Sequence, residues 1–430
     1  MSLLFTLPVW GQAIRFEQNV LFVKLKSEQA FHHPLIQHQK QLFDRVYEVG
    51  TRDAILLEND LLQNDEVEWV EKSFISNRKQ HERLNENVNK NATSSSFGLN
   101  DPMSSELWGF RPASAKGISI QEAYANMPSW QPTPVIVAVV DTGVDYRHSD
   151  LRDNMWVNTR EIPGNRIDDD NNGHVDDIYG IDVLHGDSDP MPTHFHGTHV
   201  AGTIAAVRNN NQGVAGVASH AKIMALRTIP DDTDETDRDV INSFLYAARN
   251  GARIINCSFG KRRQARTVSE TMAHIGRENN VLVVAASGND SDGANNQWYN
   301  IDRRPHYPSA FNTETMLVVT ATGLYGDLAD FANIGVRNVD VAAPGDHIFS
   351  TIIGNRYGDS SGTSMATPMV SGIAAQLLAY YPSLTPLEIK DIIIKSVVKT
   401  DSLKSKVLSG GRADLARAME YAAVNYSHRH

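Results

Sequence analysis

Three side chains in this 430-residue chain have the types that nucleophilic catalysis uses, and each stands beside a segment able to hold it. Asp141 ends the apolar run 135–140, where a carboxylate can orient a histidine and stabilise its charged form. His196 begins a run of small and apolar residues suited to a helix packed closely on a sheet. Ser364 stands at a predicted helix start, where the dipole and unpaired amides favour a developing negative charge. Side chains of these three types can serve as a hydroxyl nucleophile, a histidine base and an orienting carboxylate.

Each of these residues also has a simpler interpretation. An aspartate at a strand end often forms a turn or cap, and a serine at a helix start often only caps the helix. His194, His196 and His199 have the spacing H-x-H-x-x-H, which suits zinc, but no H-E-x-x-H carboxylate accompanies them. Pro368 supports the helix start at Ser364, because a first turn tolerates proline.

A fourth candidate is Asn289, which closes the apolar run 281–286 in the sequence Ala-Ser-Gly-Asn. Its side-chain amide could donate a hydrogen bond to an oxyanion, and Gly288 would let a substrate approach the backbone. In isolation the same residues are a common turn.

An acidic segment, 168–177, has a pattern typical of a cation-binding loop. Oxygen-bearing side chains alternate along it and a glycine follows, which suits a hard cation such as Ca²⁺, although the terminal bidentate glutamate of such loops is missing. A solvated acidic loop is the alternative. The sequence predicts a structural calcium site with these ligands: Asp168, Asp170, Asn172, His174 and Asp176.

The elements that must position these residues are buried strands. From residue 107 onward, apolar runs without polar alternation are separated by helix-like segments. This pattern predicts an α/β fold, a doubly wound parallel sheet with helices on both faces. Functional sites form at the carboxyl ends of such strands, where most of the candidate residues stand. The runs are 135–140, 223–226, 254–257, 281–286 and 316–320.

A smaller α+β domain is predicted ahead of this sheet, at residues 14–75. Its strands are expected at 20–25 and 67–70, and a helix at 27–49, where Leu, Phe and Val are spaced among polar residues. A polar linker, 76–100, follows and offers exposed backbone to proteases. The larger domain is predicted to span 101–425.

The first 13 residues resemble the back half of a secretory signal, because a short apolar stretch ends in small or polar residues. They lack a basic n-region, so an ordinary strand or frayed terminus remains the alternative.

Composition excludes several classes of partner. The net charge of −11 and the pI near 5.8 disfavour binding to nucleic acid or to anionic lipid. No apolar run approaches the roughly 18 to 20 residues that span a bilayer.

Cys257 is the single cysteine, so no internal disulfide can form and stability must come from packing or bound ions.

Taken together, these segments resemble the subtilisin-like serine proteases, the subtilase family. The order Asp, His, Asn, Ser carries the resemblance, with the blocks His-Gly-Thr-His-Val-Ala-Gly from 196 and Gly-Thr-Ser-Met-Ala-Thr-Pro from 362. It extends over 100–415. It implies a subtilisin-like fold, a triad of Asp141, His196 and Ser364, and an oxyanion hole formed by Asn289 and the Ser364 amide. It also implies that two segments flank the substrate and shape its P1 pocket, namely Ser258, Phe259 and Gly260, and Ala286, Ser287 and Gly288.

The resemblance further implies a secreted or periplasmic serine endopeptidase that acts on proteins or peptides through an acyl-enzyme. Family propeptides assist folding and then occupy the cleft. Residues 14–75 are therefore expected to be a propeptide that binds the catalytic domain in a zymogen, with self-cleavage between 75 and 98. A permanent regulatory or docking domain is the alternative.

One departure from the family bears on specificity. Lys261, Arg262 and Arg263 follow Gly260, where the family often has a second glycine. They could attract acidic substrate residues or form a solvated charged loop.

Two other functions remain to be distinguished from an endopeptidase. A serine esterase or acyl transferase is disfavoured because Ser364 does not stand in a G-x-S-x-G elbow. A non-catalytic binding homologue is disfavoured because every triad position is filled.

Overall fold

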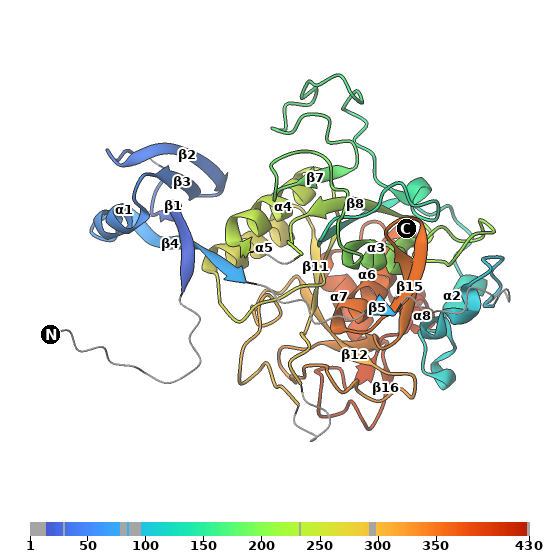
Figure 1. The fold of residues 1–430 in the computed structure, drawn as a ribbon. Helices are drawn as coiled ribbons and strands as arrows, with labels where there is room; N and C mark the ends of the chain where they lie inside the picture. Colours follow the sequence, from blue (N-terminus) through green and yellow to red (C-terminus); the bar gives the residue numbers. More distant parts are fainter. Residues whose placement is uncertain are drawn as a thin grey trace.

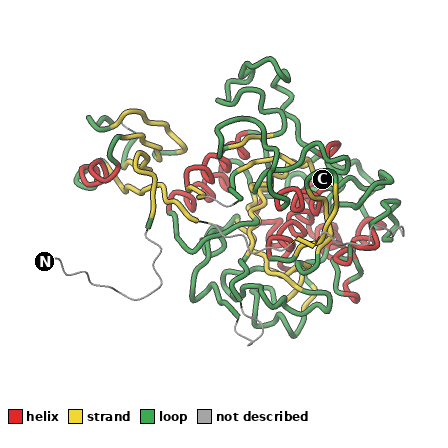
Figure 2. The backbone as a smooth tube through the Cα atoms, viewed as in Figure 1, coloured by secondary structure: helices red, strands yellow, loops and turns green. Residues whose placement is uncertain are grey.

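The computed structural model consists of a small N-terminal domain docked on a much larger α/β domain (Figure 1). Figure 2 shows helices and strands at the centre of the larger domain, with long loops around them. The segment 1–13, interpreted above as part of a signal, lies outside the described residues. The structure describes residues 14–28, 31–77, 84–85, 96–231, 234–291 and 298–427.

Within the described residues, nine strands form the central sheet, in the order β16-β17-β13-β12-β11-β10-β6-β8-β7. All neighbouring pairs are parallel except β16 and β17. All five predicted strands are present. The strands are β6 (Val135–Asp141), β7 (Gly180–Asp182), β8 (Ala221–Arg227), β10 (Ile254–Cys257), β11 (Leu282–Ala286), β12 (Met316–Thr322), β13 (Val341–Pro344), β16 (Val398–Lys399) and β17 (Gly411–Arg412).

Helices cover both faces of this sheet, which confirms the predicted doubly wound fold. α3 (His196–Ala205) packs with α6 (Thr363–Tyr380) on one side, and α4 (Asp237–Arg249) packs with α5 (Arg266–Glu278) on the other (Figure 1). Every residue of α6 is buried, as expected for a helix that is apolar all round. No helix in the described part of the chain is long and apolar enough to cross a membrane.

The remaining helical elements lie around this core. The α-helices are α2 (Ile120–Ala125), α7 (Pro386–Lys395) and α8 (Leu415–Asn425). The short 3₁₀ turns are η1 (Ser104–Glu106), η2 (Trp108–Phe110), η3 (Ala113–Ala115) and η4 (Arg152–Asn154).

The N-terminal domain is an antiparallel sheet, β2-β3-β1-β4, with one helix. The predicted helix at 27–49 is wrong, because this segment forms β2 and β3 joined by a turn at Asp44, whose φ is 41°. The spaced apolar residues face the domain core from two strands, and β2 is an edge strand with a mostly exposed polar surface. The elements are β1 (Arg15–Leu25), β2 (Ile36–Phe43), β3 (Val46–Thr51), α1 (Ala54–Leu61) and β4 (Val67–Asn77).

Two short strands connect the N-terminal segment to the larger domain. The last three residues of β4, 75–77, pair antiparallel with β9 (Asp234–Thr236). Further along, β5 (Leu84–Asn85) pairs antiparallel with β15 (Arg356–Ser360), which pairs in turn with β14 (Ile348–Ile352). The rest of the predicted linker between Asn77 and Ser96 lies outside the described residues.

Candidate active site

Asp141 and His196 form a buried pair at the carboxyl end of the sheet. Asp141 is the last residue of β6 and His196 is the first of α3. His196 Nδ1 lies 2.6 Å from Asp141 Oδ1, and both side chains are 2% exposed. Glycine at position 197 allows α3 to lie this close to Asp141. The Cβ of any other residue at this position would lie 2.1 Å from the backbone oxygen of Gly143 and 3.1 Å from Asp141 Cβ. The pairing fixes the imidazole orientation and stabilises its protonated form.

Ser364 is the second residue of α6 and contacts the segment after β10. Its Oγ donates to the backbone oxygen of Ser258 at 3.0 Å, while Ser258 Oγ donates to the Ser364 backbone oxygen at 2.8 Å. Pro368 is the sixth residue of α6, so its expected place in the first turn is wrong. Because proline has no N–H to bond residue i−4, the Ser364 carbonyl is left for Ser258. The proline thus helps to join these two serines.

Asn289 is tied to the start of α6, next to Ser364. Its Oδ1 accepts hydrogen bonds of 2.9 Å from both the backbone nitrogen and the Oγ1 of Thr363. Thr363 Oγ1 also accepts from the Gly288 nitrogen at 3.1 Å. Since an amide is planar, holding Oδ1 against Thr363 aims the Asn289 NH₂ away from it. Thr363 is therefore a positioning residue for the predicted oxyanion donor, a role that no sequence pattern suggested.

A second positioning residue is Asn333, which is fully buried beside the turn at 287–290. Its Nδ2 donates to the Ser287 oxygen at 2.9 Å, and its Oδ1 accepts from the Asp290 nitrogen at 2.9 Å. The Asn333 backbone nitrogen donates to the Gly288 oxygen at 3.0 Å. Gly288 has a φ of 99°, which favours glycine, and a Cβ there would meet Asn333 Nδ2 at 2.5 Å. No motif in the sequence marked Asn333.

His306 lies between the two segments expected to flank the P1 side chain. A Cβ built on Gly260 would lie 2.2 Å from His306 Cε1, and one on Gly288 would lie 2.9 Å from the same atom. The imidazole therefore occupies the space that the two glycines leave. Its Nε2 is 4.0 Å from Asp290 Oδ2. Only the three-dimensional fold reveals this placement.

The three basic residues after Gly260 are all partnered within the chain, so a solvated charged loop is wrong for Lys261. Lys261 Nζ binds Asp237 and lies 3.2 Å from Glu235 Oε1, and its side chain is 13% exposed. Burial lowers the pKa of Lys261, but the two carboxylates outweigh burial and raise the pKa above its usual value. Arg262 binds Asp290 at 2.9 Å. Arg263 lies 4.1 Å from the centre of the Phe74 ring.

The three histidines of the H-x-H-x-x-H pattern have different partners. His196 faces Asp141, His199 Nε2 bonds the Ile348 oxygen at 2.8 Å, and His194 Nδ1 accepts from the His196 backbone nitrogen at 3.3 Å. Within the described ranges, they do not form a group close enough to share one metal ion.

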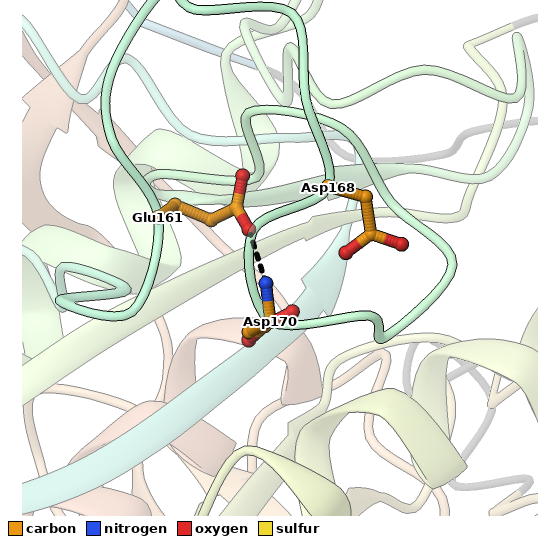
Figure 3. A group of neighbouring side chains, drawn as sticks. All are labelled: Glu161, Asp168 and Asp170. Carbon is orange, nitrogen blue, oxygen red and sulfur yellow. Dashed lines mark hydrogen bonds between the residues drawn. The ribbon is translucent and has the colours of Figure 1, made fainter.

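Among the residues that the structure describes, one cluster of carboxylates converges, and it joins the acidic segment to a glutamate upstream of it. Ligand oxygens of Glu161, Asp168 and Asp170 lie within 4.8 Å of one another (Figure 3). Glu161 is buried, and its Oε1 accepts from the Asp169 and Asp170 nitrogens at 2.8 and 3.1 Å. Glu161 thus places a glutamate carboxylate beside Asp168 and Asp170 from upstream of the acidic segment. Its position outside the D-x-D-x-N-G pattern explains why the sequence did not suggest it.

The other predicted ligands lie around this cluster. The Asn172 nitrogen donates to Asp168 Oδ1 at 3.0 Å, so Asn172 adjoins the cluster through its backbone. The Asp176 carboxylate accepts from the Gly164 and Arg166 nitrogens, and the His174 ring packs edge-on against Tyr246.

Comparison with known proteins gives a consistent result. The model of the subtilase family, Peptidase S8, matches residues 133–417. Subtilisin-like protease 1 of Plasmodium berghei is 32% identical over 357 residues, which are 80% of this chain and 58% of that protein. Thermophilic serine proteinase of Bacillus sp. strain AK1 is 36% identical over 290 residues, 67% of this chain and 61% of that protein. The chain therefore spans about three fifths of the length of these relatives.

A solved structure extends the similarity of fold to the N-terminal domain. Fervidolysin from Fervidobacterium pennivorans, described as a keratinolytic enzyme related to subtilisin, matches 96% of this chain with a TM-score of 0.69 and 22% identity. The match covers 62% of the fervidolysin chain.

Proposed function

Since the chain belongs to the subtilase family, we propose that it is a serine endopeptidase with Asp141, His196 and Ser364 as its catalytic triad and Asn289 as an oxyanion donor. The buried 2.6 Å contact between His196 Nδ1 and Asp141 Oδ1 is the observation that carries this proposal. A histidine oriented in this way directs its Nε2 to act as a base, and Ser364 at the start of α6 is the nucleophile.

The reaction proceeds in two halves. His196 Nε2 takes the proton of Ser364 as Oγ attacks the peptide carbonyl carbon, and the carbonyl oxygen becomes an oxyanion held by Asn289 Nδ2 and the Ser364 amide. His196 then gives the proton to the leaving amine as the C–N bond breaks. A water molecule, deprotonated by His196, hydrolyses the ester and restores the Ser364 hydroxyl.

Hydrolysis of two substrates tests this proposal against its alternatives. The endopeptidase cleaves a denatured protein in the interior of the chain, and Ser364→Ala removes this cleavage. Turnover of a short-chain ester without any cleavage of protein would favour an esterase. No turnover of either substrate would favour a binding homologue.

We also propose that residues 14–75 act as a propeptide. Two contacts support this: the pairing of β4 with β9, and Glu71, whose carboxylate caps the first turn of α5 by accepting from the Arg266 and Thr267 nitrogens at 2.8 and 2.7 Å. Burial of Glu71 raises its pKa, and the hydrogen bonds from Thr267 and Arg266 offset only part of this desolvation. A large parallel sheet folds slowly, and a docked domain that covers two of its helices assists it.

The N-terminus of purified active protein tests the propeptide. Self-cleavage between 75 and 98 leaves active enzyme without residues 14–74, and Ser364→Ala accumulates the full-length chain. A chain that starts near Gly98 folds poorly unless residues 1–75 are supplied separately. Fully active enzyme that still carries residues 14–74 covalently would instead identify a permanent domain.

We propose in addition that the protein binds a structural calcium ion and that it is exported from the cell. Glu161, Asp168 and Asp170 fit a hard cation because their carboxylate oxygens converge, and Ca²⁺ there would neutralise the cluster and hold the loop. Its role is structural. Export to the periplasm or medium is proposed from the enzyme class, and fractionation of expressing cells tests it.

A further inference from the structure

A row of hydrogen bonds runs through the core of the larger domain to the peptide group of the proposed nucleophile. Ser371 Oγ donates to Asn256 Oδ1 at 2.8 Å, and Asn256 Nδ2 donates to Ser258 Oγ at 2.9 Å. Ser258 Oγ in turn donates to the backbone oxygen of Ser364 at 2.8 Å. Asn256, Ser258 and Ser371 are fully buried, so bulk water does not compete for these groups.

The donors in this row all point the same way. A hydroxyl has one proton, so Ser258 Oγ, which gives its proton to the Ser364 oxygen, can only accept from Asn256. An amide donates at one end and accepts at the other, and Ser371 holds the accepting end of Asn256. Hydrogen bonds aligned in this way strengthen one another. The orientation of the Asn256 amide therefore decides where the Ser258 hydroxyl points.

The row ends on a carbonyl group that its own helix leaves open. Pro368, four residues after Ser364, has no N–H to bond the Ser364 oxygen. Ser371 follows Ser364 by seven residues, which places it two turns along the same face of α6. Asn256 belongs to β10, which lies between β6 and β11 inside the sheet. The hydrogen bonds thus fasten α6 to β10 at two places, the first of which is the nucleophile itself.

Stability alone does not explain an asparagine at position 256. It lies in an inner strand of a parallel sheet, where the residues opposite it are Val139 and Val284. Burial of an amide costs free energy, and an apolar side chain of the same shape is often no less stable at such a place. The amide must therefore contribute something that an apolar side chain could not.

What the amide can contribute is the position of the nucleophile. Ser258 belongs to the segment expected to flank the substrate, and it exchanges two hydrogen bonds with Ser364. These bonds set where Ser364 lies relative to that segment. A displacement of about 1 Å can lower a rate by about 10²-fold, because attack requires the reacting atoms to be aligned.

We propose that Asn256 and Ser371 are positioning residues for Ser364. They orient the Ser258 hydroxyl, which holds the carbonyl group of the nucleophile and so aligns its Oγ with the substrate carbonyl. They contribute to kcat and not to the binding of substrate. This rests on the proposed function, because it requires Ser364 to be the nucleophile.

Asn256→Leu tests the proposal, because leucine has nearly the shape of asparagine but forms no hydrogen bond. The substrate is a peptide p-nitroanilide whose sequence comes from a site that the wild type cleaves in denatured protein, and a fluorophosphonate counts active enzyme. The kcat falls about tenfold, KM stays within about twofold, and Tm falls by no more than about 3 °C. Asn154→Leu, at another buried asparagine, is the matched control and keeps the wild-type kcat.

A second change shows whether Ser371 acts through Asn256. Ser371→Ala alone lowers kcat about threefold, because the Asn256 amide loses the bond that fixes its orientation. Added to Asn256→Leu, the same change has no further effect on kcat, since the link is already broken. Ser104→Ala, which removes another fully buried hydroxyl, is the control and leaves kcat unchanged in both proteins.

Three results would overturn the proposal. They are an unchanged kcat in Asn256→Leu, a change confined to KM, and an equal loss of kcat from Ser371→Ala in both proteins. If Asn256→Leu does not fold, Ser258→Ala takes its place in the comparison with Ser371→Ala, because it removes the hydroxyl through which both residues act. A wild-type protein that cleaves no denatured protein would instead refute the proposed function.

Discussion

The candidate active site and the acidic loop are built in opposite ways. Asp141, His196 and Ser364 come from β6, α3 and α6, which only the folded sheet brings together. Glu161, Asp168 and Asp170 come from one stretch of chain and are held by its own backbone amides. The first site therefore depends on the whole domain, and the second depends on local turns.

Burial separates the two regions further. The side chains of Asp141 and His196 are 2% exposed, so little water weakens their interaction. Asp168 is half-buried, and each of its carboxylate oxygens already accepts a backbone amide. Changes in the active site should therefore alter the rate of reaction, whereas changes in the loop should alter stability.

The largest expected effect is that of Ser364→Ala. Removal of the nucleophile lowers kcat/KM for a peptide by at least about 10³-fold, a magnitude carried over from subtilisin. The melting temperature changes by no more than a few degrees, since the change removes one small hydroxyl, whose Oγ donates to the Ser258 oxygen. Peptide hydrolysis and thermal unfolding by circular dichroism measure both. Ser383→Ala, at an exposed position, is the control, and turnover of Ser364→Ala at the wild-type rate would refute the triad.

Asn289→Ala should have the next largest effect. Loss of an oxyanion donor lowers kcat by about 10² to 10³-fold, again a figure known from subtilisin, and leaves KM nearly unchanged. Steady-state kinetics on a peptide substrate measure the two constants separately. Asn312→Ala, at an exposed position outside the helices and strands, is the control. An effect confined to KM would assign Asn289 to substrate binding.

Calcium should act on the loop without acting on the chemistry. At 100 times its Kd, an ion that binds only the folded state adds about 2.7 kcal/mol to the free energy of unfolding, which raises Tm by about 3 °C. The double variant Asp168→Ala with Asp170→Ala loses this response and keeps its kcat at 25 °C. Calorimetry with calcium and with a chelator measures it, and Asp327→Ala is an exposed control. A Tm that no chelator moves would make the loop a solvated turn.

His306→Ala should have the smallest effect and should change selectivity alone. Removing the imidazole from between Gly260 and Gly288 enlarges the space for the P1 side chain. The kcat/KM for phenylalanine relative to alanine at P1 should rise about tenfold. A series of peptide substrates that differ only at P1 measures this ratio. An unchanged ratio would place His306 outside the pocket.

The sequence predicted the sheet well because its strands form strong local patterns, and the motif residues were proposed from equally local patterns. The runs that became β6 and β11 are continuous and apolar, and Asp141 follows the first of them directly. The segment 27–49 was misread because apolar residues spaced along a polar strand and along a helix look alike.

Residues that act through distant contacts were not predictable. Asn333 and His306 approach the active site from loops, and no spacing links them to Asn289 or Gly260. Glu161 stands outside the motif that suggested the calcium ligands. In each case the fold brings together side chains that are distant in the sequence. Such contacts leave no local pattern from which they could be predicted.

Labelling of the intact protein with a fluorophosphonate, followed by mass-spectrometric mapping, tests most directly that Ser364 is the nucleophile. The expected result is a single adduct on Ser364, with none formed in His196→Ala because the base that activates the hydroxyl is missing. An adduct on another residue, or no adduct in a preparation that cleaves protein, would contradict the proposed mechanism.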